Sequence, residues 1–203
     1  AGFALGARLV QGKRFTDLIG VWSWRAVATG FGLWVVLLVI AALVDFAMAP
    51  KGFRLTAGPG TAELALAAAA GLALQTFTEE LVFRGYATQG LLLAFRRPLP
   101  ACVVSGLIFG SLHIPNGVPQ AISATAFGMV LAWIAIRQAG IAFTFGLHFA
   151  NNLFGAVVLV SGSDVFQGSP GLFAQDTPFL MWWDVAVGTI ALVLLAVGLA
   201  RRT

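Results

Sequence analysis

The sequence is poor in charged residues and nearly free of cysteine. Only 10% of its 203 residues are Asp, Glu, Lys or Arg, whereas roughly a quarter of the residues of a soluble domain are charged. The single cysteine, Cys102, excludes an intrachain disulfide, and no group of Cys and His residues has zinc-finger spacing. These shortages exclude a disulfide-stapled secreted fold and a structural zinc module.

The chain also lacks a strong charge of one sign. Its 12 basic and 8 acidic residues give a net charge of +4, and the basic residues stand in short clusters between apolar runs. Nucleic-acid binding needs a basic stripe on an exposed face, so we expect no nucleic-acid partner. Apolar residues are abundant instead, at 59% of the chain, with a mean hydropathy of +0.92. We therefore expect a multi-pass integral membrane protein whose partner is the lipid bilayer.

Apolar stretches long enough to cross a bilayer recur along the chain. A helix needs about 20 residues to span the hydrocarbon core, and the length of the chain suits one domain. We expect an all-α bundle of about six transmembrane helices, forming a single integral membrane domain over residues 1–203 with a cytoplasmic or interfacial lead over residues 1–23. The expected spans run approximately from Trp24 to Met48, Thr61 to Gly85, Ala101 to Ile114, Pro119 to Ile136, Ile141 to Ser161 and Phe179 to Ala200.

The distribution of basic residues predicts the orientation of these spans. Lys and Arg accumulate in cytoplasmic loops, and six spans starting from a cytoplasmic N-terminus leave only Lys51 and Arg54 outside. The inner side then holds Arg8, Lys13, Arg14, Arg25, Arg96, Arg97, Arg137, Arg201 and Arg202. The outer loops hold Glu63, Asp164, Asp176 and Asp184. We predict that both termini are cytoplasmic.

Two of the expected spans are irregular in length. The third is short and ends at a turn around Pro115, and irregular backbone at membrane depth is tolerated only where it is buried or lines a wet cavity. The second has no proline from Thr61 to Phe95, and a continuous helix there would reach about 52 Å. It must tilt, project into the cytoplasm, or bend near Gly85. The short span predicts a polar cavity inside the membrane.

Ionisable and amide side chains gather in three of the apolar spans. An ionisable residue at the centre of a membrane helix costs about 2.5–3.5 kcal/mol on insertion scales and is a candidate for function. Both histidines of the protein lie in such spans. The set comprises Glu79, Glu80, Arg84, His113, His148, Asn151 and Asn152.

Helical spacing assigns partners within this set. Glu80 and Arg84 are four residues apart and share a helix face, so they can form an ion pair that lowers the cost of burying both charges. Glu79 is about 100° away around the helix and can point toward His113 or His148. An acid, two imidazoles and an amide could therefore converge in one layer of the bundle.

Three spaced motifs connect these residues to a known family. Residues 79–84 read EExxxR, residues 109–113 read FxxxH, and residues 148–152 read HxxxN. In this order on successive apolar helices they resemble the CAAX protease and bacteriocin-processing (CPBP) family of intramembrane endopeptidases, also called the Abi family. The resemblance covers a protease-like core over residues 61–161.

This resemblance implies a role for each motif residue. Glu79 and His113 would activate the attacking water, and His148 and Asn152 would stabilise the oxyanion formed on the scissile carbonyl. Glu80 and Arg84 would support the site. The implied activity is hydrolysis of a peptide bond in a membrane-associated peptide or protein, lipidated or not.

A metal-dependent reaction is an alternative on the same residues. Two histidines and a glutamate, here His113, His148 and Glu79, form a ligand set that zinc hydrolases use. The HExxH helix motif of soluble zinc proteases is absent. We favour a mechanism without a cofactor, because Glu79 and His113 suffice to activate water, and keep zinc or another divalent metal as the alternative.

Two other functions compete with proteolysis. Buried Glu, His and Arg residues also mark ion pathways, so a proton-coupled transporter is one rival. Such carriers usually contain an internal repeat with paired broken helices, and this sequence shows no repeat. The other rival is a non-enzymatic membrane protein that binds a partner or confers immunity. A Glu79→Gln exchange separates these functions, because only a protease would lose its activity with that carboxylate.

Overall fold

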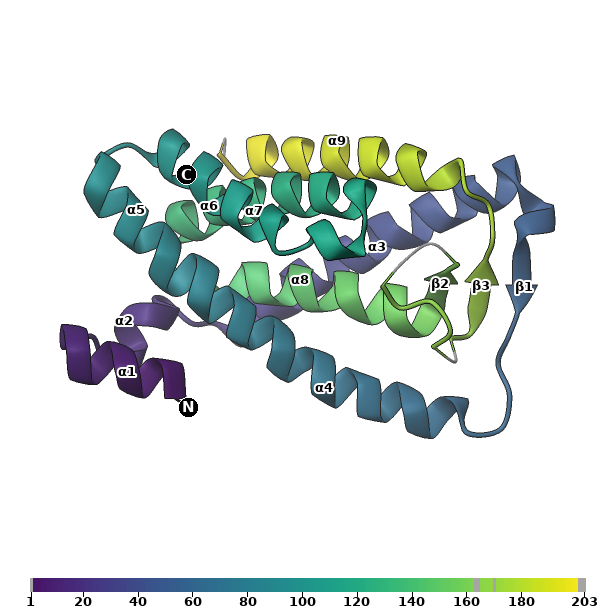
Figure 1. Cartoon of the computed structure of the whole chain (residues 1–203), viewed down its shortest axis with the longest axis horizontal. Coiled ribbons are helices and arrows are strands. Elements are labelled where there is room, and N and C mark those ends of the chain that lie inside the picture. Colours follow the sequence, from purple (N-terminus) through teal and green to yellow (C-terminus); the bar gives the residue numbers. More distant parts are fainter. Residues whose placement is uncertain (1, 163–164, 170, 201–203) are drawn as a thin grey trace.

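The computed structural model describes residues 2–162, 165–169 and 171–200, and these form a bundle of apolar helices (Figure 1). Asp164, Arg201 and Arg202, to which the sequence assigned sides of the membrane, lie outside the described residues. The helices are α1 (Gly2–Gln11), α2 (Phe15–Ile19), α3 (Trp24–Met48), α4 (Thr61–Val82), α5 (Thr88–Phe95), α6 (Pro98–Ser111), α7 (Val118–Gln138), α8 (Ala142–Leu153) and α9 (Leu180–Ala200). Short segments η1 (Pro50–Gly52), η2 (Phe83–Ala87), η3 (Ile114–Asn116) and η4 (Phe154–Val158) join some of them.

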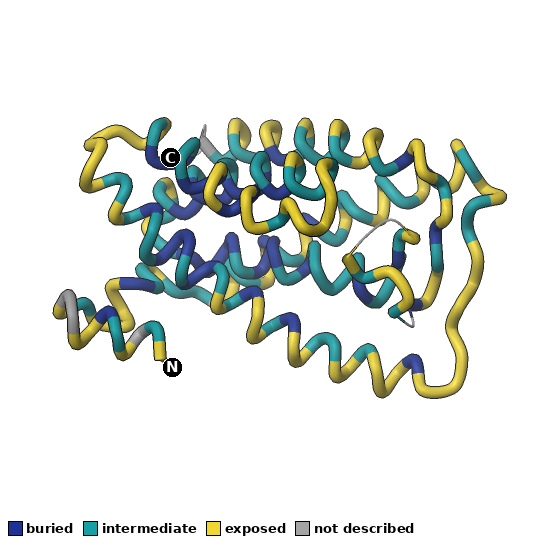
Figure 2. Tube along the Cα trace, in the orientation of Figure 1, coloured by how far each residue is buried: buried dark blue, intermediate teal, exposed yellow. Residues whose placement is uncertain are grey.

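The membrane spans agree with the sequence prediction. Four helical stretches of the described chain are long and apolar enough to cross a membrane, and α6 and the stretch from Ala142 to Val158 are shorter apolar helices. The outward faces of α3 and α9 are largely exposed (Figure 2), as expected of helices whose apolar side chains face lipid. The protein is thus an integral membrane helix bundle.

The two ends of the bundle are built from different elements. At one end, α1, α2, the turn between α5 and α6 and the turn between α7 and α8 gather (Figure 1). Backbone bonds fix this end, since Val21 N–H donates to Ala139 O at 2.8 Å and Ile141 N–H donates to Ile19 O at 3.0 Å. The sheet lies at the other end, with Lys51 and Arg54. The basic residues that the sequence assigned to opposite sides are therefore separated, and which end faces the cytoplasm stays a prediction.

The second span is one continuous helical stretch from Thr61 to Phe95. It crosses the bundle obliquely (Figure 1), and its turn η2 is a π-helix of five residues. The helix is therefore not broken at Gly85, and tilting or projection into the cytoplasm stay predictions. Gly85 instead allows close packing, because a Cβ atom there would overlap the carbonyl oxygen of Leu18.

The third span is shorter than the sequence predicted at its C-terminal end. Helix α6 ends at Ser111, and His113 lies beyond it with φ −98° and ψ 0°. The prediction that His113 lies within the helix is therefore wrong. Pro115 explains the early end, because proline disfavours helical backbone at the preceding residue and offers no N–H group.

Helices α3 and α8 pack closely side by side, and both contribute residues to the cavity lining. A Cβ atom at Gly30 would overlap the carbonyl oxygen of Phe143, and one at Gly146 would overlap that of Val27. The absence of side chains at these two positions lets the backbones touch, as small residues do between membrane helices. The contact fixes the depth of His148, two residues beyond Gly146.

A small sheet was not predicted. It has the order β1-β3-β2, where β1 (Phe53–Leu55) runs antiparallel to β3 (Phe173–Gln175) and β2 (Leu159–Ser161) runs parallel to it. Strands of three residues are too short to show an alternation of apolar and polar residues in the sequence. The all-α prediction therefore holds for the helix bundle but did not include the sheet.

Asp184 is a second correction at the sheet end. The sequence assigned it to an outer loop, but α9 begins at Leu180 and carries Asp184 in its second turn. There its side chain lines the internal cavity rather than a surface loop. The residue is exposed on α9 and also lines the cavity, so an apolar helix can hold this carboxyl group.

Candidate active site

The buried ion pair predicted from the sequence is formed. The N–O distance between Arg84 Nη1 and Glu80 Oε1 is 3.0 Å, and both side chains are fully buried. The guanidinium also lies 4.6 Å from the ring centre of Phe109. The opposite charges and the aromatic face offset part of the cost of removing both groups from water.

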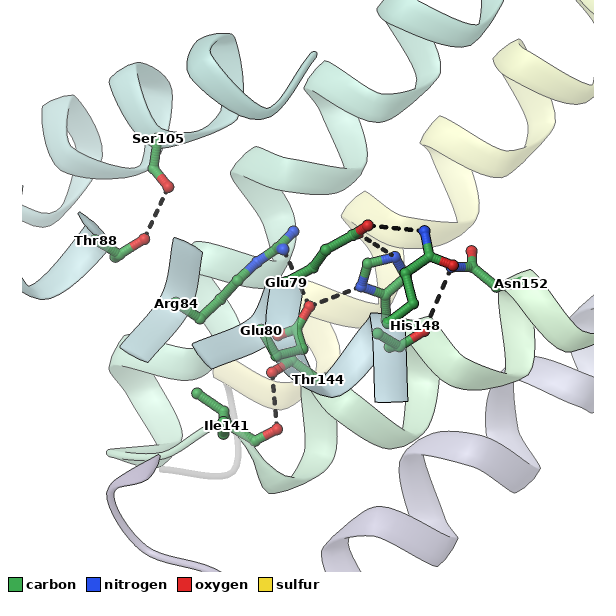
Figure 3. Close-up of polar contacts among 11 residues, drawn as sticks. Glu79, Glu80, Arg84, Thr88, Ser105, Ile141, Thr144, His148 and Asn152 are labelled. Carbon is green, nitrogen blue, oxygen red and sulfur yellow. Dashed lines mark hydrogen bonds and ion pairs between the residues drawn. The ribbon is translucent and has the colours of Figure 1, made fainter. Parts of the chain in front are cut away.

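His148 lies between two carboxylates (Figure 3). Its Nδ1 is 2.8 Å from Glu80 Oε1, and its Nε2 is 3.5 Å from Glu79 Oε2. A carboxylate only accepts hydrogen bonds, so Nδ1 carries a hydrogen and donates it to Glu80. Glu80 therefore holds the imidazole in one orientation and leaves Nε2 facing Glu79.

Glu79 is the more accessible of the two acids. Its side chain is 23% exposed, against 0% for Glu80, and Gln75 Nε2 donates to its Oε1 at 2.9 Å. Both carboxylate oxygens thus have a neighbour, and the group still reaches solvent. Of the two histidines that the sequence offered as its partner, His148 is the one in contact.

His113 lines the same cavity but has a different local partner. Its Nδ1 lies 2.8 Å from the carbonyl oxygen of Phe109, and since a carbonyl only accepts, Nδ1 is the donor. The Phe109 ring is 4.7 Å from the ring of His113 and 5.9 Å from that of His148. The Phe109 ring thus contacts both imidazoles. The bond from Nδ1 to the Phe109 carbonyl leaves Nε2 as the ring nitrogen of His113 that can accept a hydrogen bond.

The asparagines form a polar chain across α8. Asn152 Nδ2 donates to Thr76 Oγ1 at 3.4 Å, and Asn151 Nδ2 donates to Asn152 Oδ1 at 3.4 Å. Trp34 Nε1 on α3 donates to Asn151 Oδ1 at 3.1 Å. The long bonds hold the Asn152 amide only weakly, so it remains able to bind a ligand.

Three contributors to this site were missed from the sequence: Trp34, Gln75 and Thr76. Gln75 and Thr76 stand four residues before Glu79 and Glu80, on the same helix face. That spacing was the available signal, but neutral polar residues stand out less than charged ones in an apolar span.

A cavity of about 570 Å³ runs along the site. This volume lies in the range of small-ligand pockets, roughly 300–1,000 Å³. The short third span predicted a polar cavity, and this cavity is lined by both apolar and polar side chains. Its polar lining includes Gln75, His113, Asn116, Gln120, Ser123, His148, Asn151, Asn152, Asp45, Asp184 and Gln175.

The metal alternative has no assembled ligand set. Within residues 2–162, 165–169 and 171–200, no three His, Cys, Asp or Glu side chains are grouped as metal ligands. Glu79 and His148 adjoin, and His113 is not grouped with them. We therefore derive no metal-assisted step, and the mechanism without a cofactor stays a prediction.

Comparison with known proteins places the chain in a family. A family model described as type II CAAX prenyl endopeptidase, Rce1-like, matches residues 61–154, the stretch that carries all three motifs. The uncharacterized protein YyaK of Bacillus subtilis (strain 168) is 30% identical over 210 residues, which cover 98% of this chain and 70% of YyaK. No solved structure matches. The chain belongs to the Rce1-like family of type II CAAX prenyl endopeptidases, and its general class is that of a membrane protease.

Proposed function

We propose that this protein is an intramembrane endopeptidase that hydrolyses a peptide bond of a membrane-associated peptide or protein. The observation that carries the proposal is His148, held between Glu79 and Glu80 on the wall of a cavity of about 570 Å³. His148 lines the cavity, whereas Glu79 is not a lining residue and contacts His148 Nε2 beside it. An acid that reaches solvent beside an oriented imidazole can support hydrolysis by activated water.

Glu79 is the proposed general base. It is the exposed acid of the pair, and Gln75 fixes one of its oxygens, so the carboxylate is oriented and reaches water. His113 presents an unprotonated Nε2 to the cavity, because its Nδ1 donates to Phe109. These two acceptors orient the water, and Glu79 takes its proton as the oxygen attacks the scissile carbonyl.

His148 and Asn152 are the proposed donors to the oxyanion. Glu80 holds the His148 ring through Nδ1, so that Nε2 is the nitrogen proposed to donate to the oxyanion. The Asn152 amide is only weakly held by Thr76. Oriented donors of this kind contribute about 3–4 kcal/mol each to the transition state.

Collapse of the tetrahedral intermediate returns the proton. The C–N bond breaks, and Glu79, now a neutral acid, gives the water-derived proton to the departing amine. The water oxygen stays on the new carboxyl group, so the reaction consumes one water and needs no cofactor. Glu80 and Arg84 remain an internal pair that orients His148 and exchanges no atom with the substrate.

The test compares new peptide termini in cells that express the wild type or Glu79→Gln at equal levels. The matched control is Glu63→Gln, the same exchange on an exposed residue in the first turn of α4. We expect cleavages that are shared by the wild type and Glu63→Gln and absent from Glu79→Gln. Equal termini in all three strains, with folded protein present, would overturn the proposal and favour a partner-binding or transport role.

A further inference from the structure

The sheet end of the cavity carries a second polar cluster that the proposed reaction does not use. Asp45, near the end of α3, is only 4% exposed, and its Oδ1 has no hydrogen-bond partner among the described residues. The side chain of Asp184 on α9 lies within hydrogen-bonding reach of Asp45. Both residues line the cavity. Two carboxyl groups therefore converge there from different helices.

Gln175 is an independent feature of the same end. It is 3% exposed, lines the cavity, and its Nε2 has no partner among the described residues. The fold brings its strand toward the end of α3 that carries Asp45, since Gln175 pairs with Phe53 in the sheet. The ring of Phe53 packs 5.4 Å from that of Phe46, the neighbour of Asp45.

Buried polar groups without a hydrogen-bond partner are candidates for binding a ligand. Buried polar atoms in native proteins are nearly always hydrogen-bonded, yet Asp45 Oδ1 and Gln175 Nε2, in two residues that line the cavity, have no partner among the described residues. Two adjacent carboxylates also repel each other unless a proton or a cation lies between them. The cluster thus offers negative charge together with one neutral donor.

We infer that this cluster binds a Lys or Arg residue of the peptide substrate. The basic side chain lies between Asp45 and Asp184, and Gln175 donates to a carbonyl oxygen of the peptide backbone. A bare metal ion fits less well, because the Gln175 N–H group is a donor that a metal cannot use. The inference rests on the proposed function, since it treats the cavity as a peptide site.

The length of α3 gives the approximate distance from the cluster to the proposed catalytic residues. Trp34 bonds to Asn151 at the catalytic end, and Asp45 stands 11 residues further along α3, which corresponds to about 16 Å of helix. An extended peptide rises about 3.3 Å per residue. The basic residue is therefore expected about five residues from the scissile bond.

The test measures binding without cleavage. Full-length Glu79→Gln protein in lipid nanodiscs is titrated with fluorescent hydrophobic peptides that carry one Lys, or norleucine in its place, at successive positions. We expect the Lys peptide to bind about tenfold more tightly at the favoured position, which corresponds to ~1.4 kcal/mol. Asp45→Asn or Asp184→Asn should reduce its affinity to that of the norleucine peptide.

The controls separate a lost subsite from a lost fold. Asp176→Asn removes an acid that pairs with Arg54 and lies outside the cavity lining, so it should keep the preference for Lys. Norleucine-peptide binding by the Asp45→Asn variant shows that the cavity is intact. Equal affinity for both peptides, no binding of either, or a Lys preference that survives both Asp exchanges would overturn the inference. Because cleavage is not measured, failure of the protease proposal is recognised separately, by unchanged peptide termini in cells.

Discussion

At the residue scale, the proposed chemistry depends on which groups contact the two ring nitrogens of His148. One nitrogen donates to the fully buried Glu80, and the other faces the more exposed Glu79. Two neighbouring acids in the sequence thus have different environments, because adjacent residues point about 100° apart around a helix. Glu80 is buried against a guanidinium partner, whereas access to solvent makes Glu79 the acid that we propose as the general base.

The Glu80 and Arg84 pair leads to a stability prediction. Glu80→Gln leaves the Arg84 charge buried without its counter-ion, and breaking such a pair costs about 3–5 kcal/mol. We expect a markedly lower thermal unfolding temperature in detergent than for the wild type or the Glu63→Gln control. The double variant Glu80→Gln, Arg84→Met should recover part of the loss, because it removes the unpaired charge. A single variant as stable as the wild type would contradict this role.

At the scale of elements, the site depends on close contact between α3 and α8. Gly146 faces the backbone of Val27, and a bond between Trp34 and Asn151 crosses the same interface. On the second span, the helical pitch changes locally at the π-helical turn η2, which carries Arg84. Small residues and a local change of helical pitch therefore set which side chains reach the cavity.

Gly146→Ala tests this contact. Its Cβ atom would overlap the Val27 carbonyl oxygen, a backbone atom that cannot rotate away, so α3 and α8 must separate. We expect a loss of about 1–3 kcal/mol in stability, as for overpacked cores, and reduced cleavage in the terminus comparison. Gly32→Ala on α3 meets nothing within 4 Å and is the matched control. Similar unfolding temperatures for the two variants would argue against the close contact.

At the scale of the whole molecule, the ends of the bundle differ in charge and in structure. The end with α1, α2 and the α5–α6 turn carries Arg8, Arg96 and Arg97, which the sequence assigned to the cytoplasm, and the sheet end carries Lys51 and Arg54. If basic loops stay inside, the proposed basic-residue subsite opens toward the outer end of the cavity and the arginine-rich end faces the cytoplasm.

Labelling with a membrane-impermeant maleimide tests the orientation. Lys51→Cys lies at the sheet end, and Arg97→Cys lies in the turn before α6. We expect intact cells to label Lys51→Cys and to label Arg97→Cys only after lysis. The native Cys102 is buried, so the wild type should give a low background. The reverse pattern would invert the predicted topology.

The sequence predicted much of the fold but only part of the site. The positions of the spans follow from the lengths of the apolar stretches, and the Glu80 and Arg84 pair follows from spacing within one helix. Both could therefore be predicted from the sequence. The end of α6 was predicted three residues too late, because helix ends depend on a few residues. Asp184 was assigned to an outer loop although the expected last span contained it. Asp45 was not recognised because it lies near the end of an apolar span and not at its centre, and Gln175 because it lies between spans.

The sequence by itself determined the membrane class, the number of apolar segments and the three motifs, because each depends on residues close together along the chain. Only the tertiary structure decided that Glu79 contacts His148 rather than His113, and that Asp45, Asp184 and Gln175 share one cavity. The reason is physical. Contacts within a helix follow from its fixed geometry, whereas contacts between helices depend on how their side chains and glycines pack.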